Sequence, residues 1–330
     1  MDSTINPAGR QPSAPVFLDG ATITSALTAR EAAAAMESVL AAGFDPEMSE
    51  PRTRVETDSG TFMQMPASNG QYVGTKLLTI TPGNATSASP VIQGLYALFG
   101  GADQRPLAVL DGVALTELRT SSVSVMGAML LAPPGPKRLV VFGTGVQAWA
   151  HILAFAELFE LQSVDIVGRN PEAAARLVNK AEGIGLAAAV GVPAAVREAD
   201  LVICATASPT ALFDGALVKA SAVVVAIGSH DREHRELDDD LLARATVCVE
   251  SRDSAGREAG DVMQAMESGA IAGPEQLITL ADLVSKRREV AADRPSVFKT
   301  TGMPWEDLAV ATALYEACTG TTMRNGTTDD

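Results

Sequence analysis

The chain has 330 residues, of which 47% are hydrophobic and 4% aromatic, and its formal net charge is −15. This length suits two domains, and an aliphatic composition is typical of α/β proteins with buried strands. The acidic balance, without a basic stripe, excludes generic nucleic-acid binding. No apolar run reaches the ~18 residues of a membrane span, and the N-terminus lacks the basic start and apolar core of a signal peptide. We therefore expect a cytoplasmic protein without nucleic-acid or membrane partners.

The first third of the chain mixes a helix with short strands. Thr28 followed by Glu31 forms a capping box that opens a helix, and Gly43 ends it. The segments 52–57, 61–67, 72–80 and 107–112 have the composition of strands, and 114–132 is predicted to be a helix that stops at the proline-rich "PPGPK". This pattern indicates an α+β unit.

After that break, aliphatic strands alternate with helical or loop segments. The strands are predicted at 138–143, 163–168, 201–207, 222–228 and 245–250, and a last helix at 304–318. The predicted fold class is α/β: a Rossmann-type doubly wound sheet over 119–303, plus an α+β substrate-binding and dimerisation domain made of 1–118 and 304–330. Cys204, Cys248 and Cys318 have no metal or disulfide spacing, so we expect three buried thiols.

A glycine motif marks the start of the second domain. In "RLVVFGTGVQAWAH", Gly143, Gly145 and Ala148 have G-x-G-x-x-A spacing between a strand and a helix, which is typical of pyrophosphate binding at a helix N-terminus. The predicted cofactor site also includes residues of the same turn and residues that follow neighbouring strands: Thr144, Val146, Gln147, Asn170, Thr206, Ser208 and Gly228.

Arg169 bears on the choice of cofactor. It follows Gly168 at the end of the second strand, where NAD-binding folds usually present an acid to the ribose hydroxyl. A guanidinium there can bind a 2′-phosphate, so NADPH is favoured, with NADH possible. A solvated loop arginine is the alternative.

The motifs "PRTRVET", "GTKLLT", "LAVLDGVALTELRT", "VVFGTGVQAWAH", "RELDDDLLARATVCVES", "EAGDV" and "VFKTTGMPWEDLAVA" together resemble the ornithine cyclodeaminase/mu-crystallin family. The resemblance covers residues 15–318. It implies an NAD(P)-dependent homodimer, and that Arg52, Lys76 and Arg119 hold the α-carboxylate of a substrate. The family contains cyclodeaminases, alanine dehydrogenases and ketimine reductases, so the reaction stays open.

Two departures from the cyclodeaminase pattern favour a reductase. Met63 stands where those enzymes carry a glutamate, and His230 where they carry an aspartate. We expect an NAD(P)H-dependent reductase of Δ1-pyrroline-2-carboxylate, and possibly of Δ1-piperideine-2-carboxylate, with His230 and Lys76 as catalytic residues. The alternatives are an ornithine or lysine cyclodeaminase, an alanine dehydrogenase, and a non-catalytic NADPH-binding protein.

The loop "GSHDREHREL" raises the question of a metal. His234 and Asp231 resemble a ligand set, but no helix supports the spacing, so no metal site is expected. His234 and His151 are expected to be structural or exposed.

Overall fold

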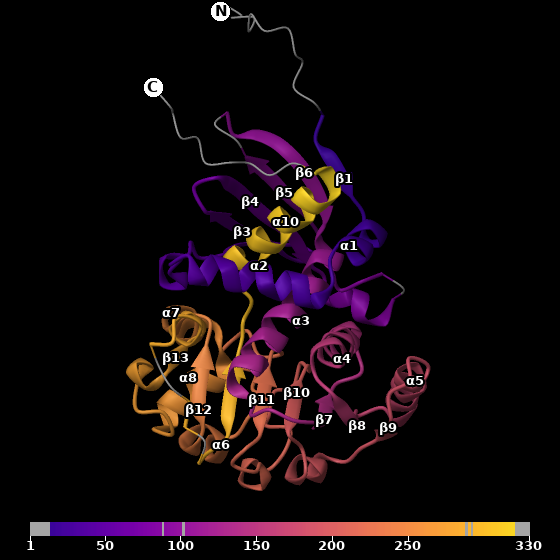
Figure 1. Ribbon diagram of the computed structural model, residues 1–330, viewed down its shortest axis with the longest axis vertical. Coiled ribbons are helices and arrows are strands. Elements are labelled where there is room, and N and C mark those ends of the chain that lie inside the picture. Colours follow the sequence, from indigo (N-terminus) through magenta and orange to yellow (C-terminus); the bar gives the residue numbers. More distant parts are fainter. Residues whose placement is uncertain (1–13, 88, 101–102, 288–289, 292, 321–330) are drawn as a thin grey trace, which may run out of the picture.

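The computed structural model describes residues 14–87, 89–100, 103–287, 290–291 and 293–320. These residues form two sheets with helices packed on them, one above the other in Figure 1. The six-stranded sheet has the order β1-β6-β5-β4-β3-β2, and the eight-stranded sheet has the order β13-β12-β14-β11-β10-β7-β8-β9. The predicted α/β class, with a Rossmann-type sheet and a second unit, is confirmed.

The six-stranded sheet is largely antiparallel. Its strands are β1 (Val16–Leu18), β2 (Thr53–Thr57), β3 (Gly60–Ser68), β4 (Tyr72–Ile80), β5 (Ile92–Gly100) and β6 (Arg105–Asp111), and only β1 and β6 pair in parallel. The helices of this unit are α1 (Gly20–Ala26), α2 (Ala29–Ala41) and the 3-10 turns Pro46–Met48 and Pro82–Thr86. The capping box of Thr28 and Glu31 forms as predicted.

All neighbouring strands of the second sheet are parallel among the described residues. They are β7 (Lys137–Phe142), β8 (Leu161–Val167), β9 (Ala188–Val190), β10 (Leu201–Cys204), β11 (Val223–Ala226), β12 (Thr246–Val249), β13 (Ile278–Thr279) and β14 (Ser296–Lys299). The helices are α4 (Val146–Leu158), α5 (Pro171–Glu182), α6 (Asp239–Arg244), α7 (Arg252–Glu258), α8 (Gly260–Ser268) and α9 (Leu280–Val284), with 3-10 turns at Pro193–Arg197, Gly215–Leu217 and Pro274–Gln276.

Five strands were not predicted, namely β1, β5, β9, β13 and β14, and two of them, β5 and β14, matter most for the architecture. Strand β5 contains Gly94 and ends at Gly100, which weaken its β pattern; an added Cβ at Gly94 would lie 2.5 Å from the Leu77 carbonyl oxygen. Strand β14 has four residues and ends in Lys299, yet it lies between β11 and β12. Its position brings the end of the chain back through the middle of the parallel sheet.

Two helices connect the units. Helix α3 (Gly112–Leu131) packs on α2 and β5 at one end and reaches β11 and β14 at the other, and α10 (Pro304–Thr319) packs on α2, β3 and β4 (Figure 1). The division into 1–118 with 304–330 and 119–303 stays a prediction, because its first boundary falls inside α3. Residues 1–13 and 321–330 lie outside the described part.

The core is aliphatic, as the composition indicates, and it runs through both units. Cys204 and Cys248 are buried free thiols, whereas Cys318 is exposed near the end of α10, so the expectation of three buried thiols was wrong for that residue. Within the described ranges, no helix is both long and apolar enough to cross a membrane.

His151 joins α4 to α3 inside the core. Its side chain is fully buried; Nδ1 lies 2.7 Å from the Gln147 carbonyl oxygen and Nε2 lies 2.9 Å from Ser124 Oγ. Burial lowers the pKa of His151 from 6.5 to about 4; the charge of Arg119 acts in the same direction, and the hydrogen bond to Gln147 opposes it. The ring is therefore neutral at pH 7 and structural. His151 was expected to be either structural or exposed, and the first of these is correct.

We predict that the free energy of unfolding falls as the pH drops from 6.5 toward 4. The unfolded chain takes up a proton on His151 before the folded chain does, so the stabilisation present above pH 6.5 is lost by up to roughly 3 kcal/mol. Urea unfolding at several pH values, on the wild type and on His151→Asn, isolates this contribution. The stability difference between the two proteins should shrink as the pH falls; a constant difference would contradict the prediction.

Candidate functional site

The turn between β7 and α4 has the geometry of a phosphate-binding turn. Gly143 has φ +121°, and an added Cβ would lie 2.4 Å from the Ala205 carbonyl oxygen, so only glycine fits. Gly145 is the N-cap of α4 and offers no side chain to the free backbone N–H groups of the first turn. Ala148 is fully buried where the helix packs on the sheet. The turn can therefore present N–H donors to a pyrophosphate.

An open cleft of about 690 Å³ lies beside this turn. Six of the predicted cofactor residues line it: Gly143, Thr144, Arg169, Asn170, Thr206 and Ser208. Gly145, Val146, Gln147, Ala148 and Gly228 do not line it; the first four belong to the start of α4 and Gly228 follows β11. The cleft is large enough for part of a dinucleotide.

Of the described residues that line the cleft, Arg169 is the one that carries a charge. Its side chain is exposed, and within the described part of the chain no ion pair involves it. Asn170 caps α5 by accepting a hydrogen bond from the Ala173 N–H at 3.1 Å. Among the described residues, the lining of this cleft therefore contains a cation without an ion pair and no carboxylate.

A buried acid, Glu236, joins the loops that follow β10 and β11 beside this cleft. Glu236 accepts hydrogen bonds from the backbone and hydroxyl of Thr206, at 2.8 and 2.7 Å, and from the Gly228 N–H at 2.7 Å. Lys299 donates to the carbonyl oxygens of Ala226 and Thr300. These bonds tie together the carboxyl ends of β10, β11 and β14, where parallel sheets bind ligands. Sequence reasoning did not single out Glu236, although it lies in the quoted motif "RELDDD".

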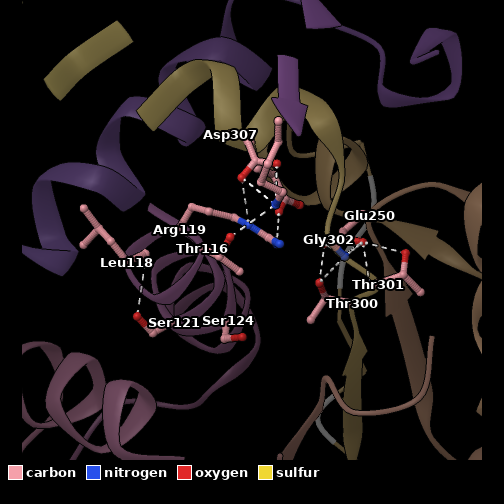
Figure 2. A network of polar contacts seen from close by, with 12 residues as sticks. Thr116, Leu118, Arg119, Ser121, Ser124, Glu250, Thr300, Thr301, Gly302 and Asp307 are labelled. Atoms are coloured by element: carbon pink, nitrogen blue, oxygen red, sulfur yellow. Dashed lines mark hydrogen bonds and ion pairs between the residues drawn. The ribbon is translucent and has the colours of Figure 1, made fainter. Parts of the chain in front are cut away.

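The three predicted clamp cations come from separate elements and meet at one place. Arg52 precedes β2, Lys76 lies in β4 and Arg119 in α3, and all three are largely buried. Arg52 Nη2 donates to the Gly302 carbonyl oxygen at 2.8 Å, and an added Cβ on Gly302 would lie 2.4 Å from Arg119 Nη1. Gly302, in the segment after β14, thus lies against both arginine side chains, and Figure 2 shows its position relative to Arg119.

Each of these cations is already paired with a buried acid. Arg52 contacts Glu258 at 2.8 Å, Lys76 contacts Asp307 at 2.9 Å, and Arg119 contacts Glu306 at 3.1 Å and Asp307 at 3.2 Å. Sequence reasoning missed these acids. A signal was available, because Glu258 lies in "EAGDV" and the other two in "PWEDLA". An otherwise unexplained acid pair at the start of an apolar helix points to buried cations.

A fourth acid, Glu250, shapes the loop between β14 and α10. It accepts hydrogen bonds from the Thr301 N–H at 2.9 Å and the Gly302 N–H at 3.2 Å, and from the hydroxyl of Thr300 (Figure 2). Burial raises the pKa of Glu306 well above its usual value of 4.5, and the nearby carboxylate of Glu250 raises it further, whereas Arg119 lowers it. The neutral form of Glu306 is therefore favoured relative to a solvated glutamate.

Burial also shifts the cations. It lowers the pKa of Lys76 from 10.5 to about 8, with Arg119 acting in the same direction and Asp307 opposing. Burial opposes the charge of Arg119 as well, but Asp307 and Glu306 outweigh it and raise the pKa of Arg119. Lys76 is thus the cation of the clamp that can exchange a proton near neutral pH.

His230 lies in the loop between β11 and α6. It is exposed, and its Nδ1 lies 3.1 Å from the Gly228 carbonyl oxygen. The surrounding protein lowers the pKa of His230 by desolvation, and the charges of Lys299 and, more weakly, Arg52 lower it further, against an opposing effect of Asp231. Met63 lies buried in β3 beside Met65 and Leu78.

His234 and Asp231 pair with each other. The His234 ring lies 2.7 Å from Asp231 Oδ1, which also accepts the N–H groups of Glu233 and His234. Asp231 therefore closes a turn. Among the described residues, three acids, Asp214, Asp238 and Asp240, come close enough to share an ion, but Asp238 caps α6 and exposed acidic groups are common without a metal.

Comparisons with known proteins agree on one family. Residues 15–322 match the model of the ornithine cyclodeaminase/mu-crystallin family. The chain is 34% identical to the Δ1-pyrroline-2-carboxylate reductase of Paracoccus denitrificans, over 94% of this chain and 99% of that protein.

Solved structures agree with this result. A probable ornithine cyclodeaminase from Bordetella pertussis is 30% identical, with a TM-score of 0.83 over 93% of this chain and 98% of the other. The Thermococcus litoralis Δ1-pyrroline-2-carboxylate reductase, solved with NADH and L-proline, has a TM-score of 0.84 over 92% and 97% of the two chains; at 22% identity it supports the fold. This chain belongs to the ornithine cyclodeaminase/mu-crystallin family.

Proposed function

We propose that this protein is an NAD(P)H-dependent reductase that converts cyclic ketimines, Δ1-pyrroline-2-carboxylate and Δ1-piperideine-2-carboxylate, into L-proline and L-pipecolate. The observation that carries the proposal is the buried clamp of Arg52, Lys76 and Arg119 beside the segment that follows β14. Three cations from separate elements suit one carboxylate on a small ligand. The family and the reductase of Paracoccus denitrificans support the same reaction.

Each residue of the site would have its own role in the reduction of the ketimine. Arg52 and Arg119 hold the carboxylate, and the bound nicotinamide supplies a hydride to the carbon of the C=N bond. Reduction of a neutral imine also needs a proton on the ring nitrogen. Lys76, with its pKa of about 8, is protonated at pH 7 and suits this role. His230, whose pKa is lowered from its usual value by desolvation, is the second candidate.

Two features argue against a cyclodeaminase. Met63 is buried in an apolar group of three residues and offers no charge to a leaving amine. His230 at the aspartate position gives no anionic base. Because the chain is similar to the probable ornithine cyclodeaminase of Bordetella pertussis, ornithine is included in the substrate test. Pyruvate with ammonia is included to test for an alanine dehydrogenase.

The cofactor is proposed to be NADPH, with NADH accepted more weakly. Arg169 is the one charge that lines the cleft at the end of β8, and no carboxylate lines it. An acid at this end would repel a 2′-phosphate, whereas a free guanidinium can bind it through two hydrogen bonds.

Arg169→Ala should weaken NADPH binding by about 1–3 kcal/mol, because a charged hydrogen bond to the phosphate is lost. NADH has no 2′-phosphate, so its dissociation constant should change little. Fluorescence titration of both cofactors measures the effect, with Arg176→Ala on α5 as a control that lies outside the cleft lining. Equal losses for the two cofactors would contradict the phosphate role of Arg169.

The reaction is tested by following NADPH oxidation with Δ1-pyrroline-2-carboxylate, Δ1-piperideine-2-carboxylate, and pyruvate plus ammonia, and proline formation from ornithine. The two ketimines should be reduced fastest. Arg119→Lys keeps the charge but loses the planar fork, so kcat/KM for the ketimine should fall at least ~10-fold while NADPH binding stays near normal. Arg105→Lys, at an exposed residue that begins β6, is the matched control. Rapid turnover of ornithine without any ketimine reduction would refute the reductase.

One face of the six-stranded sheet indicates how two copies of the chain would associate. One face of this sheet carries Lys76, Tyr96 and Leu98 toward α10 and α3, and the opposite face carries Val55, Phe62 and Leu95. These three side chains are 58%, 36% and 40% exposed. An apolar sheet face of this kind is a typical dimer interface, and we propose a homodimer built on it.

Sedimentation at micromolar concentration should therefore give a dimer of the 34.2 kDa chain. Leu95→Glu should shift the protein toward monomer, because a charge would be buried in the interface. Leu153→Glu, an exposed leucine on α4, is the control and should leave the dimer intact. A wild-type monomer would refute the proposal.

A further inference from the structure

Asp307 occupies a position that neither the family resemblance nor the cofactor site explains. It lies in the first turn of α10 and is fully buried. Its two carboxylate oxygens lie 3.0 and 2.9 Å from Lys76 Nζ, and Oδ1 lies 3.2 Å from Arg119 Nε. A buried carboxylate that contacts two clamp cations at once can control the charge and the direction of both.

The surroundings of Lys76 make this contact important. Its side chain is 1% exposed on β4. The groups that face it are Asp307 from α10, Arg119 and Thr116 from α3, Arg52 from the segment before β2, and Tyr96, its partner in the register of β5. Arg119 and Arg52 disfavour a third positive charge, and Asp307 is the anion that contacts Nζ. Glu306, the neighbouring acid, forms its ion pair with Arg119, whereas the ion pair of Lys76 is with Asp307.

We propose that Asp307 is a positioning residue that keeps Lys76 protonated and aims its ammonium group at the substrate, so that Lys76 can deliver the proton required by ketimine reduction. The proposal rests on the proposed function for its chemistry. A hydride reaches the imine carbon, the π electrons of the C=N bond pass to nitrogen, and nitrogen takes a proton from Lys76 Nζ. Lys76 is left neutral beside Asp307 and regains its proton from solvent.

The pairing of Lys76 with Asp307 also allows Lys76 to regain the proton that it gives to the substrate. A lysine with its ordinary pKa of 10.5 would hold its proton too tightly, whereas a buried lysine without an anion would lose its charge below neutral pH. Burial and the two arginines lower the pKa of Lys76, and Asp307 limits the fall to about 8. Asp307 thus places the titration of Lys76 just above neutral pH, where a general acid is most effective.

The direct test follows the titration of Lys76 without any substrate. The protein is labelled with ¹³C at the lysine ε carbon, the Lys76 signal is assigned with Lys76→Met, and its shift is followed with pH by NMR. The midpoint should lie near 8 in the wild type. In Asp307→Asn it should fall by about 1–3 pH units, because a contacting opposite charge is lost. An unchanged midpoint would overturn the proposal.

Glu306→Gln is the matched control, since it removes the adjacent buried acid that contacts Arg119 and not Lys76. It should move the midpoint of Lys76 much less than Asp307→Asn does. Equal shifts would show that general charge removal, and not the Asp307 contact, sets the pKa. His230→Ala should leave this midpoint where it is in the wild type.

Kinetics supply the second readout. The ammonium form of Lys76 is the active form, so kcat/KM for the ketimine should fall as the pH rises through its pKa. This alkaline limb should move to lower pH in Asp307→Asn by the same amount as the NMR midpoint. If the alkaline limb of the kcat/KM profile stays in place while the NMR midpoint of Lys76 moves, Lys76 is not the proton donor. If the protein reduces no ketimine, the proposed function fails, and the NMR titration still decides whether Asp307 controls Lys76.

Loss of Asp307 could unfold the protein, because Lys76 would be a buried charge without its anion. In that case, the double variant Lys76→Met with Asp307→Asn should be more stable in urea than Asp307→Asn alone, since the uncompensated cation is gone. A double variant that is no more stable would overturn the coupling.

Discussion

The buried ion pairs between the first turn of α10 and the clamp cations are the interaction on which the site depends. Asp307 contacts Lys76 and Arg119, and Glu306 contacts Arg119 again. Lys76 and Arg119 come from a strand and a helix of different parts of the chain, and without these acids they would be uncompensated charges inside the protein. Helix α10 therefore supplies the anions that allow Lys76 and Arg119 to be buried side by side.

The same junction connects the clamp to the nucleotide cleft. Lys299 ends β14 and donates to the carbonyl oxygens of Ala226 and Thr300, so it ties the end of β11 to the loop before α10. Glu250 holds the next residues of that loop through their N–H groups, and Gly302 lies against both arginines. A displacement of β14 would move the cofactor edge and the carboxylate clamp together, which suits a reaction that needs both in register.

The clamp and the nucleotide cleft differ in whether their cations are paired with acids. Each cation of the clamp has an acid beside it, and burial brings the pKa of Lys76 to about 8. The cleft beyond Gly143 is lined by one charge, Arg169, which is exposed and unpaired among the described ion pairs. Paired buried cations suit a small, partly neutralised ligand, while a free exposed cation suits a phosphate.

The sequence by itself determined the class of fold and the glycine turn, since these depend on local patterns: aliphatic runs and a G-x-G-x-x-A spacing. The clamp role of Arg52, Lys76 and Arg119 came from the family motifs that contain them and stays a proposal. The helix 114–132 and the capping box at Thr28 followed from the same local rules. Strands β5 and β14 did not, because glycines interrupt the first and the second is too short to show a period.

Only the tertiary structure decided which acids meet the cations. Glu258, Glu306 and Asp307 lie far along the chain from Arg52, Arg119 and Lys76, and no spacing rule relates them. The insertion of β14 between β11 and β12 and the return of α10 onto β3 and β4 bring them together. Burial then fixes the proton affinities, because desolvation and contacts between distant residues, not neighbours in sequence, determine the pKa of a buried group.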